Sequence, residues 1–194
     1  MPLGAAIGIA LARAHLIGAE RKGPHVSLLA RIFPKRVDDS VRPLWHRVVE
    51  IAREPRWYAE YGIADTVPGR FDAITLVMAL VLLRMEREEA LIAPSVRLTE
   101  LFVEDMDGQL RESGVGDLVV GKHMGRLMSV LGGRLGALRE AMPRGGPALE
   151  EALARNVTLI DGADAGPLAR AAAALADRLA ATSADDLLAA RIPS

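Results

Sequence analysis

The residues from Gly116 to Lys122 come closest to a chemical motif in this sequence. Two glycines separated by four residues and followed by a lysine match the start of a phosphate-binding loop, whose backbone N–H groups hold phosphate oxygens. His123 stands where such a loop needs a serine or threonine hydroxyl for magnesium, and an expected helix, not a strand, precedes the motif. We therefore interpret it as a turn between two helices, with nucleotide or small-molecule binding as the alternative.

Other patterns that would support chemistry are incomplete. Asp105-Met106-Asp107 resembles the start of a calcium loop, but Leu110 replaces the sixth-position glycine and Gly116 replaces the twelfth-position glutamate. The four histidines lie far apart, and the absence of cysteine excludes disulfides, cysteine metal ligands and thiol nucleophiles. No serine, histidine and acid arrangement is recognisable from spacing. The sequence therefore predicts no catalytic residue, no metal and no cofactor.

The composition favours helices packed through aliphatic side chains. The 194 residues are 51% hydrophobic but only 4% aromatic, and leucine, alanine and arginine dominate. A formal net charge of −1 gives no overall attraction to nucleic acid or anionic lipid. The longest uncharged apolar run, 73–83, is too short to span a bilayer. We expect an all-α protein, a single helical domain of antiparallel packed helices with Ala-rich C-terminal helices.

Proline and glycine residues interrupt the helical pattern and divide the chain into segments. Residues 1–25 are expected to be an N-terminal extension that is not native or not ordered, because 26–33 resembles a natural chain start. Residues 26–142 are expected to form the helical core, and 147–194 a C-terminal segment packed on it. Ser95 is expected to cap a helix that begins there. The other expectations are helices at about 41–52, 71–88, 95–114, 117–142, 148–156, 166–181 and 184–190, a short turn at 57–61 and a loop over 63–72.

Two neighbouring helices are expected to carry opposite charge. The first is crowded with carboxylates, the second is mostly basic, and the short Gly114-Val115-Gly116 turn joins them. Helices joined by so short a turn fold back antiparallel, which places the two sets of charges near one another as a self-complementary hairpin. The acidic positions are Glu100, Glu104, Asp105, Asp107 and Glu112, and the basic positions are Lys122, Arg126, Arg134 and Arg139.

Small residues form a stripe along the basic helix. Each glycine costs about 1 kcal/mol relative to alanine in a helix interior, so some interaction must offset several of them. Their spacing of three or four places them on one face, where another backbone can approach closely. We expect tight packing within this chain, with a groove for a helix of another protein as the alternative. The stripe consists of Gly121, Gly125, Ser129, Gly132 and Gly136.

Two longer blocks resemble the ubiquinol-cytochrome c chaperone family, whose members assist assembly of respiratory complex III. The first block spans 57–72 and ends in DTVPGRFD. The second spans 101–122 and contains EDMD and LRESGVGD. The likeness is strongest over 44–142, and the Gly-Val-Gly-Asp turn makes it more specific than the short motifs above.

The resemblance implies an all-helical, non-enzymatic protein that binds newly made cytochrome b, the membrane subunit of complex III, until cofactors and partner subunits join. A second assembly factor or the ribosome is a further candidate partner, and peripheral contact with the membrane is compatible with the role. By similarity, the client-binding positions are Tyr58, Asp65, Thr66, Gly69, Arg70, Phe71 and Asp72 in the first block, and Asp105, Asp107, Arg111, Gly114, Gly116 and Asp117 in the second.

Three points stay open at this stage. Arg70 and Asp72 serve either the client or the anchoring of their own loop, because an arginine beside carboxylates commonly organises a turn. The methionines supply either core packing or an adaptable client surface. A generic helical adaptor that binds proteins through its acidic face remains an alternative function. The expected location is the bacterial cytoplasm, at the cytoplasmic face of the inner membrane when the client is engaged.

Overall fold

The first helix in the described residues is α3, Arg42–Ala52, in a computed structural model that describes residues 40–112 and 117–193. Pro43 lies in the first turn of α3, where a missing backbone N–H costs nothing. The expected N-terminal extension, 1–25, lies outside the described residues. Apolar side chains recur at helical spacing on one face of α3, and that face is buried through Leu44, Trp45, Val48, Ile51 and Ala52.

Helices dominate the described part of the chain, which confirms the expected all-α class. No strand occurs among these residues beyond an isolated antiparallel bridge between Ile63 and Leu159. None of the described helices is long and apolar enough to cross a bilayer. The elements after α3 are α4 (Arg56–Ala59), α5 (Val67–Met85), the 3-10 turn η1 (Glu89–Leu91), α6 (Ile92–Glu112), α7 (Asp117–Ala141), α8 (Gly146–Asn156), α9 (Gly166–Ala181) and α10 (Ala184–Leu188).

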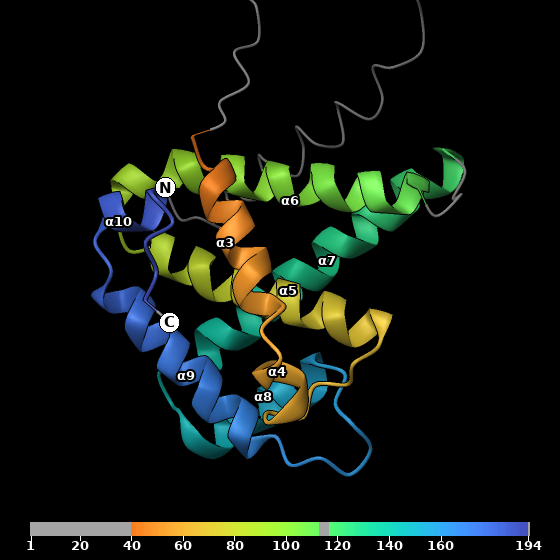
Figure 1. Ribbon diagram of the computed structural model, residues 1–194, viewed down its shortest axis with the longest axis vertical. Helices are drawn as coiled ribbons and strands as arrows, with labels where there is room; N and C mark the ends of the chain where they lie inside the picture. The colour runs from red at the N-terminus through yellow and green to blue at the C-terminus, as the bar shows by residue number, and fades with distance from the viewer. Residues whose placement is uncertain (1–39, 113–116, 194) are drawn as a thin grey trace, which may run out of the picture.

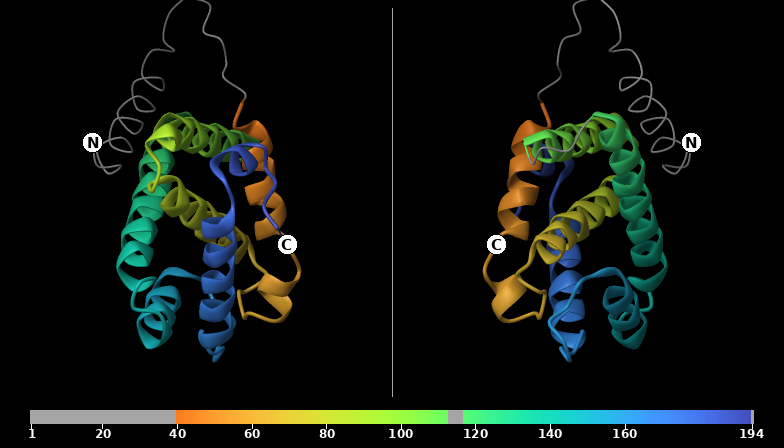
Figure 2. Two further views of the ribbon diagram at one scale, coloured as in Figure 1. Left: turned by 90° about the vertical axis from the view of Figure 1, so that its left-hand side faces the viewer. Right: turned by 90° about the vertical axis from the view of Figure 1, so that its right-hand side faces the viewer.

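Helix α5 forms the centre of the fold. All ten residues from 73 to 82 are buried, as expected for a helix that is apolar around its whole circumference. It packs against α3, α6, α7 and α9. Figure 1 shows α6 lying across the top of the view above α5, and Figure 2 shows α5 between α7 on one side and α3 and α9 on the other. The core therefore surrounds one buried helix.

Helix α5 begins earlier than the sequence indicated. The expected loop over 63–72 ends at Thr66, whose hydroxyl accepts a hydrogen bond from the backbone N–H of Gly69 at 3.2 Å. This is an N-cap, and Pro68 follows in the first helical turn, where proline is tolerated. Pro68 and Gly69 thus belong to the helix rather than to a loop.

Ser95 is not the N-cap of the acidic helix, so that prediction is wrong. Helix α6 begins three residues earlier, at Ile92, directly after η1. Ser95 is buried inside the first turn, and its hydroxyl donates to the carbonyl oxygen of Ile92 at 2.8 Å. Because that hydroxyl bonds back to a carbonyl, it does not accept from the helix N–H groups as a cap would.

The expected charge pairing between the acidic and basic helices does not form among the described side chains. Helices α6 and α7 pack against each other, but Glu100 and Glu104 both bind Arg97 of their own helix. Arg134 of α7 instead pairs with Asp72 of α5, and Arg139 pairs with Glu86 directly after the end of α5. The basic face of α7 is therefore used against the central helix.

The C-terminal helices are held to α5 by a buried arginine. Arg84, only 7% exposed, donates to the carbonyl oxygens of Leu179 at 3.0 Å and Thr182 at 2.8 Å, and it pairs with Glu88. These two carbonyls close the end of α9, where helical carbonyls lose their intrahelical partners. The Arg84 side chain thereby fixes the C-terminal end of α9 on the end of α5.

Candidate functional site

The first sequence block folds around two aromatic side chains that tie α4 to α3. The indole N–H of Trp57 donates to the carbonyl oxygen of Ile51 at 2.6 Å, and the Tyr58 hydroxyl donates to that of Ala52 at 2.8 Å. Both acceptors lie in the last turn of α3, whose carbonyls have no partner within the helix. Gly62 then turns the chain with a φ of +80°, which favours glycine.

Gly69 allows the start of α5 to lie directly against the preceding segment. A Cβ added at this position would lie 1.9 Å from the carbonyl oxygen of Ala64. That oxygen belongs to rigid backbone, because Ala64 also donates its N–H to the carbonyl oxygen of Thr158 at 2.9 Å. The glycine is therefore needed for a close approach of backbone, which is a structural reason for its place in the block.

Replacing this glycine should loosen the whole block. We expect Gly69→Ala to lower the free energy of unfolding by about 1–3 kcal/mol, the usual cost of overpacking a tight contact. Chemical denaturation followed by circular dichroism measures the change. Gly108→Ala is the matched control, because a Cβ there has nothing within 4 Å. An equally small effect of both substitutions would contradict the close approach.

Asp72 lies at the meeting point of three segments. One carboxylate oxygen accepts from Arg134 of α7 at 2.8 Å, and the other accepts the backbone N–H and the hydroxyl of Thr158 at 2.8 and 2.7 Å. Arg134 also donates to the carbonyl oxygens of Asp72 and Asn156. The two ionic side chains are only 13% and 4% exposed. Asp72 therefore anchors α7 and the loop between α8 and α9 to the start of α5.

Arg70 and Asp65 form an exposed ion pair beside this anchor. The Arg70 guanidinium donates to the Asp65 carboxylate at 2.6 Å, with the two side chains 66% and 57% exposed. That hydrogen bond lowers the pKa of the Asp65 carboxyl and raises the pKa of Arg70. Burial raises the pKa of the neighbouring Tyr58 hydroxyl, which Arg70 partly opposes. Asp65 and Arg70 are exposed to a partner and Tyr58 is only partly buried, unlike Asp72.

Phe71 connects the first block to the second. Its ring lies 6.5 Å from that of Phe102, which in turn lies 5.9 Å from Trp45. Helices α5 and α6 run in opposite directions, so the start of α5 and the end of α6 lie at the same end of the molecule (Figure 1). The fold thus brings the two sequence blocks to one end.

The described residues of the second block lie on helices α6 and α7. Asp105 is exposed on α6, whereas Met106 is 6% exposed and belongs to the core. Asp107 and Arg111 lie on α6 and Asp117 opens α7, but their side chains are not among those described. Gly114 and Gly116 lie outside the described residues.

A helix precedes the motif that suggested nucleotide or small-molecule binding as the alternative. Helix α6 ends at Glu112 and helix α7 begins at Asp117, whereas a phosphate-binding loop follows a strand. In the part of the chain that the structure describes, no group of three metal-binding side chains occurs.

Two exposed hydrophobic side chains were not singled out from the sequence. Val67 is 84% exposed and Ile160 is 52% exposed, and they are the large hydrophobic residues that the described surface exposes most. Ile160 donates its N–H to the carbonyl oxygen of Gly62 at 2.9 Å, so its segment lies beside 62–64, which precedes Val67 and the start of α5. Nothing in the sequence indicated this exposure beyond the polar neighbour of each of the two residues. The pairing of 62–64 with 158–160 joins segments that are far apart in the chain, so no local pattern predicts it.

The methionines do not provide a comparable surface among the described residues. Met78 and Met85 are fully buried, and Met106 and Met128 are 6% and 7% exposed. They pack in the hydrophobic core with the aliphatic residues. The interpretation of methionine as core packing is thus confirmed for these four positions.

Comparison with known proteins identifies the family. The family model described as ubiquinol-cytochrome C chaperone matches residues 59–193, which is more than half of the chain. The crystal structure of the Cbp3 homolog from Brucella abortus is similar with a TM-score of 0.68 and 32% sequence identity, covering 84% of this chain and 93% of that chain. No curated protein matches. The chain therefore belongs to the ubiquinol-cytochrome c chaperone family.

Proposed function

We propose that this protein is a non-enzymatic assembly chaperone that binds newly made cytochrome b during biogenesis of respiratory complex III. Membership of the ubiquinol-cytochrome c chaperone family over 59–193 supports a chaperone role in complex III assembly. The similarity to a Cbp3 homolog across nearly the whole of that chain supports the same role. The bacterial cytoplasm, at the inner face of the membrane, is the place where a nascent membrane subunit would be met. A second assembly factor or the ribosome is a further proposed partner.

The client surface proposed here lies at the start of α5. The observation that carries it is the exposure of Val67 at the start of α5 and of Ile160 on the segment paired with 62–64, since exposed apolar groups mark contact sites for apolar partners. The exposed Arg70–Asp65 pair flanks Val67 in the chain, and both of its charges act on the Tyr58 hydroxyl. Such a combination of apolar anchors with a polar edge is typical of protein interfaces.

The residues inferred from the family resemblance then divide by role. Tyr58, Asp65 and Arg70 are proposed to contact the client, with Asp105 on the neighbouring helix. Asp107, Arg111, Gly114, Gly116 and Asp117 stay proposed contacts on sequence grounds alone. Four residues hold the surface in shape, each through a contact already described: Thr66, Gly69, Phe71 and Asp72.

Deleting the gene in its host tests the function. We expect complex III and cytochrome b protein to fall while the cytochrome b transcript stays at its normal level, because an unprotected subunit is degraded after translation. Spectroscopic quantification of cytochrome b and immunoblotting of complex III measure the effect. Unchanged complex III would reject the function itself.

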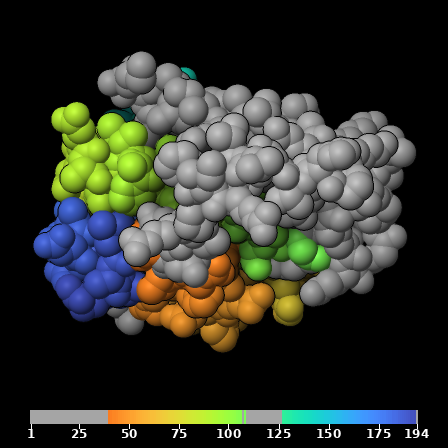
Figure 3. Space-filling view, turned by 90° about the horizontal axis from the view of Figure 1, so that it is seen from above, coloured from red at the N-terminus to blue at the C-terminus, as the bar shows by residue number. Residues whose placement is uncertain are grey.

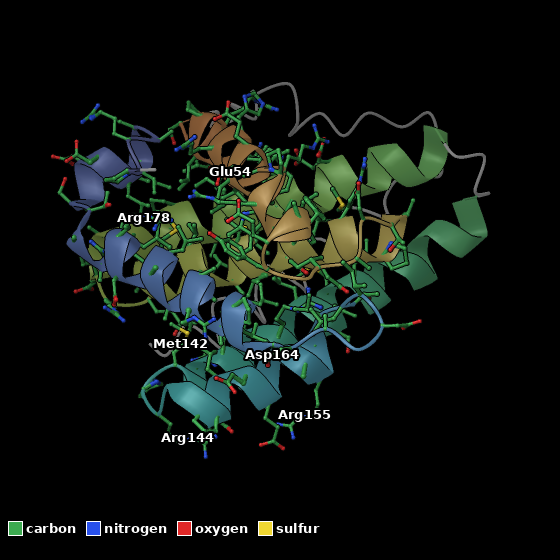
Figure 4. The ribbon with its side chains drawn as sticks, turned by 60° about the horizontal axis from the view of Figure 1, so that its bottom comes forward. Glu54, Met142, Arg144, Arg155, Asp164 and Arg178 are labelled. Carbon is green, nitrogen blue, oxygen red and sulfur yellow. The ribbon has the colours of Figure 1, made fainter. Side chains whose placement is uncertain are left out.

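Complementation of the deletion tests the surface separately. Val67→Asp/Ile160→Asp should fail to restore complex III although the variant protein accumulates normally, since both side chains are exposed in the free chaperone. Arg70→Ala should restore complex III only in part. Arg155→Ala is its matched control: Arg155 forms an ion pair of similar exposure with Glu151 and projects outward from α8 (Figure 4). Full restoration by the double variant would reject this surface but not the function.

A further inference from the structure

Two short segments that are far apart in the chain, 62–64 and 158–160, pair as an antiparallel ribbon. Two backbone hydrogen bonds of 2.9 Å join them, one on each side of the bridge between Ile63 and Leu159. We call 158–160 the outer segment, because it belongs to the loop between α8 and α9 that runs along the lower right edge of the molecule in Figure 1.

The two edges of this ribbon differ in hydrogen bonding. In an antiparallel pair enclosed by two such bonds, the two central residues point their N–H and C=O groups away from each other, toward the two edges. At one edge the N–H of Ile63 donates to the carbonyl oxygen of Trp57 at 3.1 Å. At the other edge neither the N–H nor the C=O of Leu159 has a hydrogen-bond partner in the part of the chain that the structure describes. The outer segment therefore presents an unpaired β-edge.

The outer segment is held in an extended shape before anything binds. Val157, which precedes it, has extended backbone angles, with φ at −127° and ψ at 134°. The carboxylate of Asp72 accepts the backbone N–H and the hydroxyl of Thr158 at 2.8 and 2.7 Å. A segment that is already fixed loses little conformational entropy when another chain binds to it. The unpaired edge is thus preorganised for pairing.

The side chains of the outer segment favour an apolar partner. Successive side chains of an extended segment point to opposite faces, so Leu159 packs against the core while Ile160 is 52% exposed. Residues 157–160 read Val-Thr-Leu-Ile and contain neither a charge nor a proline, the residues by which proteins commonly block pairing at a strand edge. The exposed Ile160 side chain therefore lies beside an edge that is open to pairing.

We propose that the outer segment binds an extended, apolar stretch of the client by β-strand addition, in which the N–H and C=O groups of Leu159 pair with the client backbone. This inference rests on the proposed function and names the form in which the client is recognised. An extended chain offers unpaired main-chain groups for such pairing, whereas a helix has bonded most of its own internally. Ile160 contacts a side chain of the added segment. The client segment is therefore one that has not yet formed a helix.

Short overlapping peptides that cover the host's cytochrome b are the probe for this edge. Fluorescence anisotropy identifies the peptides that bind the full chain, and hydrogen exchange measured by NMR follows the Leu159 amide. At a peptide concentration of about ten times Kd, we expect this amide to exchange about tenfold more slowly, because a bonded N–H exchanges only when the peptide leaves. Unchanged exchange with a bound peptide, or binding of no peptide, would overturn the proposal. Protection that rises with chaperone concentration in the absence of peptide would assign the edge to a second copy and overturn it as well.

Exchanging one backbone atom removes the proposed bond and keeps the side chain. Leu159→leucic acid, the α-hydroxy analogue of leucine, puts an ester oxygen in place of the N–H. We expect Kd for a binding peptide to rise about fivefold, which corresponds to about 1 kcal/mol, the net value of one hydrogen bond.

Ala184→lactic acid is the matched control. The N–H of Ala184 opens α10 and has no intrahelical partner, and α10 lies at the end of the molecule that Figure 3 shows from above. Each exchange also weakens one carbonyl that accepts a backbone hydrogen bond, that of Thr158 in the first case and that of Ser183 in the control. The two variants should therefore have similar melting temperatures. Equal peptide affinity in the two variants would contradict pairing at Leu159.

Methylating the peptide nitrogens one at a time distinguishes an added strand from a docked helix. Neighbouring N–H groups of an extended segment point to opposite sides, so methylation should abolish binding at the position that faces Leu159 and spare the positions on either side of it. Equal losses at neighbouring positions would exclude strand addition. The chaperone function itself fails only if deletion of the gene leaves complex III unchanged, so the two failures are distinguishable.

Discussion

Asp72→Ala should lower the free energy of unfolding by about 3–5 kcal/mol, the cost of leaving one partner of a buried ion pair without the other. Arg134 is only 4% exposed on its side chain, so water cannot replace the lost carboxylate. The substitution also removes the acceptor of both Thr158 hydrogen bonds, which releases the loop between α8 and α9. Urea denaturation followed by circular dichroism measures the loss.

Two further variants show whether the loss of stability comes from the buried network or from removing any aspartate. Asp65→Ala breaks an exposed ion pair a few residues away and should change stability little, because exposed pairs are screened by solvent. Asp72→Ala/Arg134→Met removes both buried charges and should recover part of the loss, as replacing a whole buried pair often does. A loss at Asp72 no larger than that at Asp65 would contradict the anchoring role.

Local patterns in the sequence predicted most of the helices. The spacing of Leu44, Trp45 and Val48 predicted α3, and the continuous apolar run from 73 predicted a buried helix. The Ala-rich segments at the end of the chain appear as α8, α9 and α10 near the expected positions. These elements were predictable because their helical signal is contained in a window of one to three turns.

The boundaries at Thr66 and Ser95 show where local reasoning failed. Both residues are good N-cap types that precede apolar periodicity, yet only Thr66 caps a helix. Pro68 and Gly69 suggested a loop, but the helix forms there because Gly69 accommodates the Ala64 carbonyl oxygen. A contact with a neighbouring segment decided the outcome in that case, and it is invisible to a propensity scale.

The candidate site depended even more on distant contacts. Asp72 and Arg134 are 62 residues apart, and Asp72 and Thr158 are 86 apart, so no spacing pattern relates them. The resemblance to a family drew attention to Asp72 but not to its partners. Ile160 was missed because its exposure arises from the pairing of 158–160 with 62–64. Sequence alone therefore located one side of the surface and not the side that completes it.

The packing of the glycine stripe on α7 differs from the expected one, and the difference should be measurable as a change in stability. Tight packing within the chain was expected, but a Cβ added at Gly132, Gly133 or Gly136 has nothing within 4 Å in the described structure. Ser129, on the same face, is exposed as well. The described end of the stripe thus offsets none of its helix cost through intrachain packing, and the groove for another helix stays the open alternative.

Gly132→Ala/Gly133→Ala/Gly136→Ala should therefore raise the free energy of unfolding by about 2–3 kcal/mol, since each glycine is disfavoured by about 1 kcal/mol inside a helix. The gain arises because alanine loses less backbone entropy on folding and meets open space here. Urea denaturation measures it, with Gly69→Ala as the opposite case in which the added methyl clashes. A loss of stability would mean that the stripe is packed after all.

Assaying the triple variant by complementation then tests the groove, because added methyl groups would block a close-packed helix while the chaperone itself is more stable.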